Sequence, residues 1–152
     1  MVARKSIPDE HHVMRYCQPR LHQLDGEGRF IAIIPQAFEL RPDDGGNLSV
    51  TWIEYFGPYD LASKSKAAKA FQSSLTSGKL GKKGVFATAQ VKMITETRAH
   101  GTKALRVVHD PVPTNLGHAE IRQFSDDDIR LLEYLATEVF AEIDHVKDLG
   151  LH

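Results

Sequence analysis

The sequence predicts a single α+β domain in which an antiparallel or mixed sheet packs against helices and the chain ends on a long helix. Short segments with alternating apolar residues indicate strands, and segments with apolar residues three or four apart indicate helices. The length of 152 residues fits one domain of ordinary size. The expected order is ββαββ(β)α over residues 30–152. Residues 1–29 receive no firm assignment beyond a short helix over about 9–17.

The first two strands are expected on either side of an acidic turn. The apolar run 30–34 is closed by Pro35, which suits a short buried strand better than a helix. Residues 42–47 contain a proline, two acids and two glycines, which is the composition of a turn. In the next segment, 48–56, apolar and hydroxyl-bearing residues alternate at first, as in a half-buried strand.

A helix and a hairpin are expected in the middle of the chain. Asp60 follows a Gly-Pro pair and is a suitable N-cap for a helix that runs to about Ser77. The segments 85–96 and 103–109 have the composition of strands and flank a turn that contains glycine. Together they predict a β-hairpin.

A short strand at 118–124 and a long helix are expected to complete the domain. Ser125 is a suitable N-cap, and the three aspartates that follow it place negative charge at the positive end of the helix dipole. Gly150 is a suitable end for this helix. Its apolar stripe would consist of Ile129, Leu132, Ala136, Val139, Ile143 and Val146.

Composition excludes several classes of protein. The formal net charge of −1 gives no strong overall attraction to nucleic acid or to an anionic membrane. Cys17 is the only cysteine, which rules out an intramolecular disulfide and a four-cysteine zinc site. The longest apolar run is far shorter than the roughly 20 residues of a membrane-spanning helix, and no apolar segment follows the basic N-terminus. We therefore expect a cytoplasmic protein without a membrane partner.

Two histidines and two carboxylates surround a loop that contains two prolines. His109 and Asp110 precede this loop, and His118 and Glu120 follow it. Imidazoles and carboxylates are the groups that acid/base hydrolysis or metal binding requires. If the loop brings the histidines together, they predict a hydrolase, for example one acting on nucleic acid or nucleotides. The alternative is that His109 merely continues the apolar face of its strand.

No known metal or cofactor motif accompanies these residues. A zinc-dependent deaminase would need cysteines downstream of the triplet His118-Ala119-Glu120, and the chain has none there. The sequence therefore predicts no metal site and does not identify a cofactor.

A second candidate site is the glycine- and lysine-rich loop 78–84. Its glycines allow backbone N–H groups to approach an anion, and Lys79, Lys82 and Lys83 supply positive charge. This pattern favours a sensor of a small ligand or nucleotide. The loop is not a P-loop, because it leads into a predicted strand rather than a helix. The alternative is an ordinary solvated basic surface.

Segments 40–56 and 109–121 resemble parts of short, uncharacterised bacterial proteins, and this resemblance implies a bacterial setting without implying an activity. Charge is distributed unevenly: residues 60–84 hold six lysines and one acid, while 120–148 hold nine acids and three basic residues. With no enzyme motif present, these features favour an accessory or binding component of a bacterial multi-protein system, for example of the defence or toxin–antitoxin type. Such a component would have a protein partner.

Overall fold

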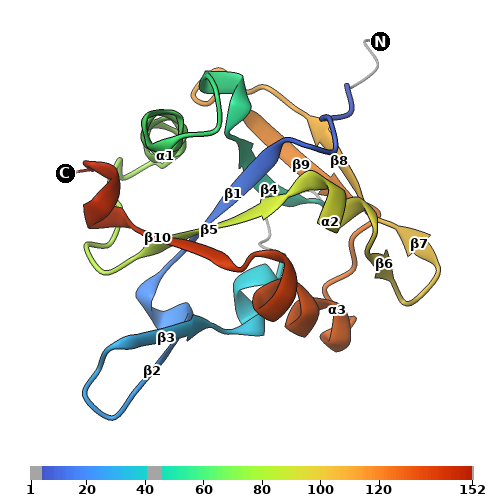
Figure 1. The fold of residues 1–152 in the computed structure, drawn as a ribbon, viewed down its shortest axis with the longest axis horizontal. Helices are drawn as coiled ribbons and strands as arrows, with labels where there is room; N and C mark the ends of the chain where they lie inside the picture. Colours follow the sequence, from blue (N-terminus) through green and yellow to red (C-terminus); the bar gives the residue numbers. More distant parts are fainter. Residues whose placement is uncertain (1–4, 41–45, 152) are drawn as a thin grey trace.

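Six antiparallel strands form the main sheet, in the order β10–β5–β1–β4–β9–β8 (Figure 1). The computed structural model describes residues 5–40 and 46–151. The strands of this sheet are β1 (His12–Cys17), β4 (Leu48–Trp52), β5 (Val85–Gln90), β8 (Arg106–His109), β9 (His118–Arg122) and β10 (Glu142–His145). Two small hairpins add β2 (His22–Leu24) with β3 (Phe30–Ile33), and β6 (Arg98–Ala99) with β7 (Lys103–Ala104). The predicted α+β fold is confirmed, and the sheet is antiparallel.

Each face of the sheet has its own hydrophobic core. Helix α1 (Leu61–Ser74) covers one face, here called the α1 face, where Met14, Tyr16 and Phe86 are buried. The opposite face, here called the α3 face, carries α2 (Val91–Thr95), α3 (Ile129–Tyr134) and the β2–β3 hairpin (Figure 1). Short 3₁₀ helices connect these elements at Pro19–Leu21, Pro35–Phe38, Glu54–Phe56 and Val146–Leu149.

The helix expected over 9–17 is wrong, because this segment forms β1, a central strand of the sheet. Its side chains alternate between two cores: Val13 and Cys17 face the α3 side, while Met14 and Tyr16 face the α1 side. A strand buried on both faces lacks the alternation of apolar and polar residues that identifies a half-buried strand. The sequence pattern of β1 was therefore not recognisable.

Helix α1 begins as predicted. The Asp60 carboxylate accepts a hydrogen bond from the Ser63 N–H at 2.8 Å, which satisfies one of the free amides at the helix start. The helix ends at Ser74, close to the expected Ser77.

The hairpin predicted from 85–96 and 103–109 is wrong. Strand β5 pairs with β1 and β10, whereas β8 pairs with β9. The chain leaves the sheet after Gln90 and forms α2, which buries Val91 and Ile94 in the α3-face core. Only the two-residue strands β6 and β7 pair across the expected turn.

The C-terminal helix is present but much shorter than predicted. Its N-cap is Asp128, whose carboxylate accepts from the Leu131 N–H at 3.2 Å, and not Ser125. Helix α3 continues into a π-helical turn, Leu135–Val139, and the chain then forms the edge strand β10 against β5. Pairing with β5 satisfies backbone groups that a longer helix would have satisfied internally. Of the predicted stripe, Leu132, Ala136 and Val139 are buried, Ile129 is exposed, and Ile143 and Val146 lie beyond the helix.

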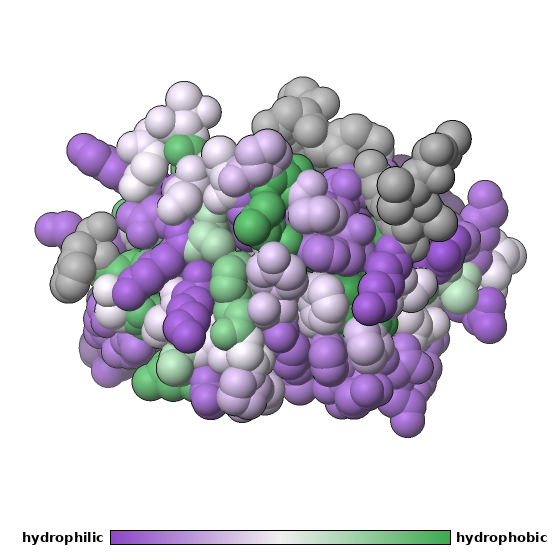
Figure 2. All heavy atoms as spheres, turned by 90° about the horizontal axis from the view of Figure 1, so that it is seen from above, coloured by the Kyte–Doolittle hydropathy of each residue, from purple (hydrophilic) through white to green (hydrophobic). Residues whose placement is uncertain are grey.

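Among the described residues, no helix combines the length and the apolar character needed to cross a membrane. The turn predicted at 42–47 lies largely outside the described residues. Figure 2 looks down on the molecule from the top of Figure 1, the side on which α1 lies. Hydrophilic side chains occupy most of this surface, and apolar groups form smaller separate areas between them (Figure 2).

Candidate functional site

A pocket of about 250 Å³ opens on the α1 face, between the end of α1 and the loop that joins β8 to β9. Its floor is formed by β1, β4 and the start of β9. Its lining combines five apolar residues with a tyrosine, three other hydroxyl-bearing residues, a histidine and an arginine. The pocket is lined by Met14, Arg15, Tyr16, Ser49, Val50, Phe71, Ser74, Leu75, Val112, Thr114 and His118.

His118 supplies the imidazole of this pocket, and its neighbours fix its tautomer. The ring atom Nδ1 lies 2.8 Å from the backbone carbonyl oxygen of Asp110 and 3.3 Å from Oδ2 of the same residue. Because a carbonyl oxygen can only accept, Nδ1 carries the proton. In the neutral ring Nε2 is therefore an acceptor, and it lies 3.2 Å from the hydroxyl oxygen of Ser49.

Ser49, His118 and Asp110 thus lie in a row, with the Nδ1 proton donated to the Asp110 backbone carbonyl and the Asp110 carboxylate 3.3 Å from the same nitrogen. The His118 and Asp110 side chains are 19% and 18% exposed, so they are shielded from bulk water but still reachable. A hydroxyl beside the free nitrogen of an imidazole whose other nitrogen faces a carboxylate is the arrangement of nucleophile, base and orienting acid in serine hydrolases. Strand β4 supplies the hydroxyl, and β9 with its preceding loop supplies the other two groups.

The loop between β8 and β9 is held in place by a buried amide. The Asn115 side chain donates to the Thr51 hydroxyl at 3.0 Å and accepts from the Gly117 N–H at 3.1 Å. A Cβ at Gly117 would lie 2.5 Å from the ring of Phe56, so this position needs a glycine. These contacts return the chain so that the Asp110 N–H donates to the His118 carbonyl at 2.9 Å.

The predicted convergence of His109 and His118 is not observed. Because β8 and β9 pair His109 with Ala119, the His109 side chain lies on the α3 face, opposite to that of His118. Its ring packs against Trp52 and Tyr55, and its Nε2 lies 2.8 Å from the Leu116 carbonyl oxygen, to which it donates. His109 therefore supports the loop from the other side of the sheet.

Glu120 lies on the same face as His118, one pleat further along β9. Its carboxylate is 3.1 Å from the Arg122 guanidinium. Of the four residues predicted as a cluster, the structure brings together His118 and Asp110, and it places Glu120 in an ion pair beside them.

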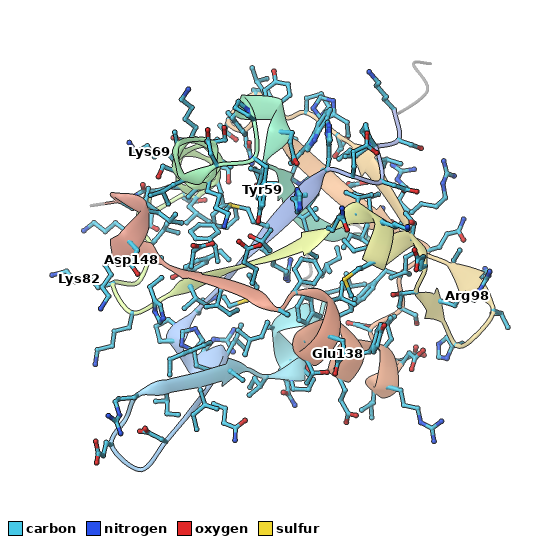
Figure 3. All side chains as sticks on the ribbon, in the orientation of Figure 1. Tyr59, Lys69, Lys82, Arg98, Glu138 and Asp148 are labelled. Carbon is cyan, nitrogen blue, oxygen red and sulfur yellow. The ribbon has the colours of Figure 1, made fainter. Side chains whose placement is uncertain are left out.

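The three lysines of the loop 78–84 are all exposed and do not form one site. Lys79 lines a second pocket, of about 320 Å³, that also contacts Tyr16 and Phe71. Lys82 lines a third pocket, of about 530 Å³, beside Leu80 of the same loop and Val146 and Leu151 of the C-terminal segment. Figure 3 shows Lys82 on the outside of the molecule. Lys83 lines none of these three pockets.

A buried lysine joins α1 to the C-terminal strand. Lys64 Nζ lies 2.6 Å from the Glu142 carboxylate and 2.9 Å from that of Asp144. The Tyr59 hydroxyl donates to Glu142, and the His12 ring stacks on the Tyr59 ring. The oppositely charged segments noted in the sequence therefore meet within the molecule.

Charge pairing outweighs burial in this cluster. Burial lowers the pKa of Lys64, whereas its interactions with partners such as Glu142 and Asp144 raise it. Together these interactions outweigh the effect of burial, so the net shift of the pKa is upward. Burial raises the pKa of the Glu142 carboxyl, and the hydrogen bonds from Lys64 and Tyr59 bring it below its ordinary value. We interpret the cluster as a structural clamp, because each charge in it has a partner.

Sequence patterns missed Ser49 because a serine on the polar side of a strand is indistinguishable from a solvated one until the strand's neighbours are known. In the part of the chain that the structure describes, no group of three or more histidine, cysteine, aspartate or glutamate residues is arranged to bind a metal ion. Among known proteins, no family model, curated protein or solved structure matches this chain. A functional assignment therefore depends on the geometry of these residues.

Proposed function

We propose that this protein is a hydrolase that cleaves a carboxylic ester through an acyl-enzyme intermediate. Ser49 is the nucleophile, His118 the general base, and Asp110 the residue that orients the imidazole. The observation that carries the proposal is the 3.2 Å contact between His118 Nε2 and the Ser49 hydroxyl, with the opposite ring nitrogen held by Asp110. Such contacts are often long in a site without substrate and shorten when substrate binds.

The chemistry follows from the tautomer. The Ser49 oxygen attacks the carbonyl carbon of the ester while His118 Nε2 takes the hydroxyl proton. The bond to the alcohol then breaks, and the proton on Nε2 passes to the departing alcohol oxygen. Water attacks the acyl-serine and gives its proton to Nε2, and that proton returns to Ser49 as the acid leaves. Thr114 also lines the pocket and carries a hydroxyl, which we assign as a donor to the developing oxyanion.

The lining of the pocket supports an ester rather than a phosphodiester as the substrate. Met14, Phe71, Leu75 and Val112 offer apolar contacts beside His118, as is usual for small-molecule sites. The loop lysines that would favour a nucleotide do not line this pocket, and Arg15, which does, donates from its guanidinium to the backbone carbonyls of Ala37 and Ser49. Hydrolysis of nucleic acid or nucleotides, as considered from the sequence, is therefore not the activity we propose.

The experiment is hydrolysis of p-nitrophenyl acetate and butyrate by the wild-type chain and matched variants. Ser49→Ala and His118→Gln should lower kcat/KM by at least about 100-fold, since each removes a group that acts in the transition state. Asp110→Asn should cost only roughly 10-fold, because the backbone carbonyl of Asp110 still holds Nδ1. Ser73→Ala is the control, since Ser73 is exposed on α1 and hydrogen-bonds only locally to Lys69. Equal rates for the wild type and Ser49→Ala would refute the proposal.

The prediction of a protein partner stays a prediction. One of the features behind it, the opposite charge of two segments, is partly accounted for by the ion pairs of Lys64. Size-exclusion chromatography of the native complex tests it independently of any activity.

A further inference from the structure

The pocket at His118 adjoins the pocket at Lys79. Both are lined by Tyr16, Phe71 and Leu75, so these three side chains form a shared boundary between them. The two pockets therefore lie side by side on the α1 face, and we treat them together as one groove between the Ser49–His118 pair and the loop that carries Lys79.

Two contacts fix the lysine loop against this groove. The Gly81 N–H donates to the Tyr16 hydroxyl at 2.8 Å, so the loop is tied to one of the shared residues. Gly84 packs against the same ring so closely that a Cβ there would lie 2.5 Å from it. These contacts attach the loop to Tyr16 at Gly81 and Gly84, a short distance along the chain from Lys79.

The charge in the groove is of one sign. No carboxylate is among the residues that line either pocket. Lys79 lines the pocket away from His118, and Arg15, which lines the His118 pocket, donates from its guanidinium to the backbone carbonyls of Ala37 and Ser49. The middle of the groove is aromatic and aliphatic. An apolar path with a cation at one end and a nucleophile at the other is complementary to a chain molecule that carries an anion at its end.

We propose that the substrate is an ester whose apolar acyl chain ends in a carboxylate, and that Lys79 binds this carboxylate while Ser49 attacks the ester. The identity of the substrate rests on the proposed function, but the anion-binding groove does not. Lys79 here determines specificity and takes no part in bond breaking. Neither Lys82 nor Lys83 lines the groove, so the loop supplies one functional cation and not three.

The first arm of the test compares p-nitrophenyl monoesters of adipic and suberic acid with neutral p-nitrophenyl esters of the same chain length. The wild type should prefer the anionic esters, and Lys79→Ala should lower kcat/KM for them by roughly 3- to 10-fold, mainly through KM. The neutral esters should be unaffected, and Lys83→Ala, the matched control, should retain the preference. Added salt should weaken the preference, since an exposed ion pair is screened.

The second arm measures binding without turnover, by titrating octanoate and octanol into the Ser49→Ala variant and following backbone amide signals of the groove by NMR. Octanoate should bind more tightly than octanol, and adding Lys79→Ala should remove the difference. Hydrolysis that depends on His118 but not on the substrate's charge or Lys79 would overturn this inference and leave the proposed function standing. If no ester is hydrolysed, the proposed function fails, and the binding arm alone decides: octanoate binding that depends on Lys79 supports the groove, and its absence overturns it.

Discussion

Replacing Lys64 with methionine should destabilise the protein markedly. The Lys64 side chain is 9% exposed and pairs with Glu142 and Asp144, which are 52% and 21% exposed. Removing one partner of a fully buried ion pair costs about 3–5 kcal/mol, because the remaining charge stays unpaired. Here water can reach Glu142, so we expect a smaller loss, about 2–3 kcal/mol. For a chain of this size that corresponds to a fall in Tm of roughly 4–12 °C.

Urea denaturation at neutral pH measures this loss, and Lys69→Met is the control. Lys69 lies on the same helix but is exposed and points outward in Figure 3, so its replacement should change the free energy of unfolding by less than about 0.5 kcal/mol. A loss below about 0.5 kcal/mol for Lys64→Met would refute the interpretation of the cluster as a structural clamp.

The stability lost in Lys64→Met should also depend on pH. The hydrogen bonds of Glu142 hold its pKa below its ordinary value of 4.5, despite the opposing effect of burial. A carboxyl with a depressed folded-state pKa stabilises the protein above its unfolded-state pKa, and this stabilisation is lost as the pH falls through the folded-state pKa. The stability difference between wild type and Lys64→Met should therefore shrink below about pH 4.5. A constant difference down to pH 3 would contradict the pairing.

Two further predictions concern the α3-face core. Leu132→Ala should lower the free energy of unfolding, measured by urea denaturation, by roughly 2–5 kcal/mol, because Leu132 is buried there. A loss below about 0.5 kcal/mol would mean that this face of α3 is not packed against the core. Cys17 is buried and forms no disulfide, so a thiol reagent should modify it only after unfolding, and a reducing agent should leave Tm unchanged; rapid modification of the native protein would contradict its burial.

The elements that could be predicted are those whose pattern is local. The alternation at the start of 48–56 and the cap at Asp60 led to β4 and α1, since neither depends on distant parts of the chain. Strands β1 and β5 are buried on both faces, so neither shows an amphipathic pattern. Ile143 and Val146 fit a helical spacing only by coincidence. The segment that contains Ile143 forms β10 instead, because it pairs with the edge of β5.

The candidate site was predictable in part for the same reason. Asp110 and His118 flank a loop stiffened by prolines, and the sequence alone indicated that this loop could bring side chains together. It could not indicate that the pleat separates His109 from His118, since that depends on the pairing of β8 with β9. The hydroxyl of Ser49 comes from a strand 69 positions away from His118, so only the tertiary fold reveals the contact.

Covalent labelling of Ser49 tests the central claim most directly. An alkyl fluorophosphonate reacts with a serine whose proton is removed by a neighbouring base, and mass spectrometry locates the adduct. We expect stoichiometric labelling of Ser49 in the wild-type chain and at least about 100-fold slower labelling in His118→Gln, with circular dichroism confirming that the variant is folded. An unlabelled Ser49 in the wild type, or equal labelling rates in the two proteins, would contradict the assignment of Ser49 and His118 as nucleophile and base.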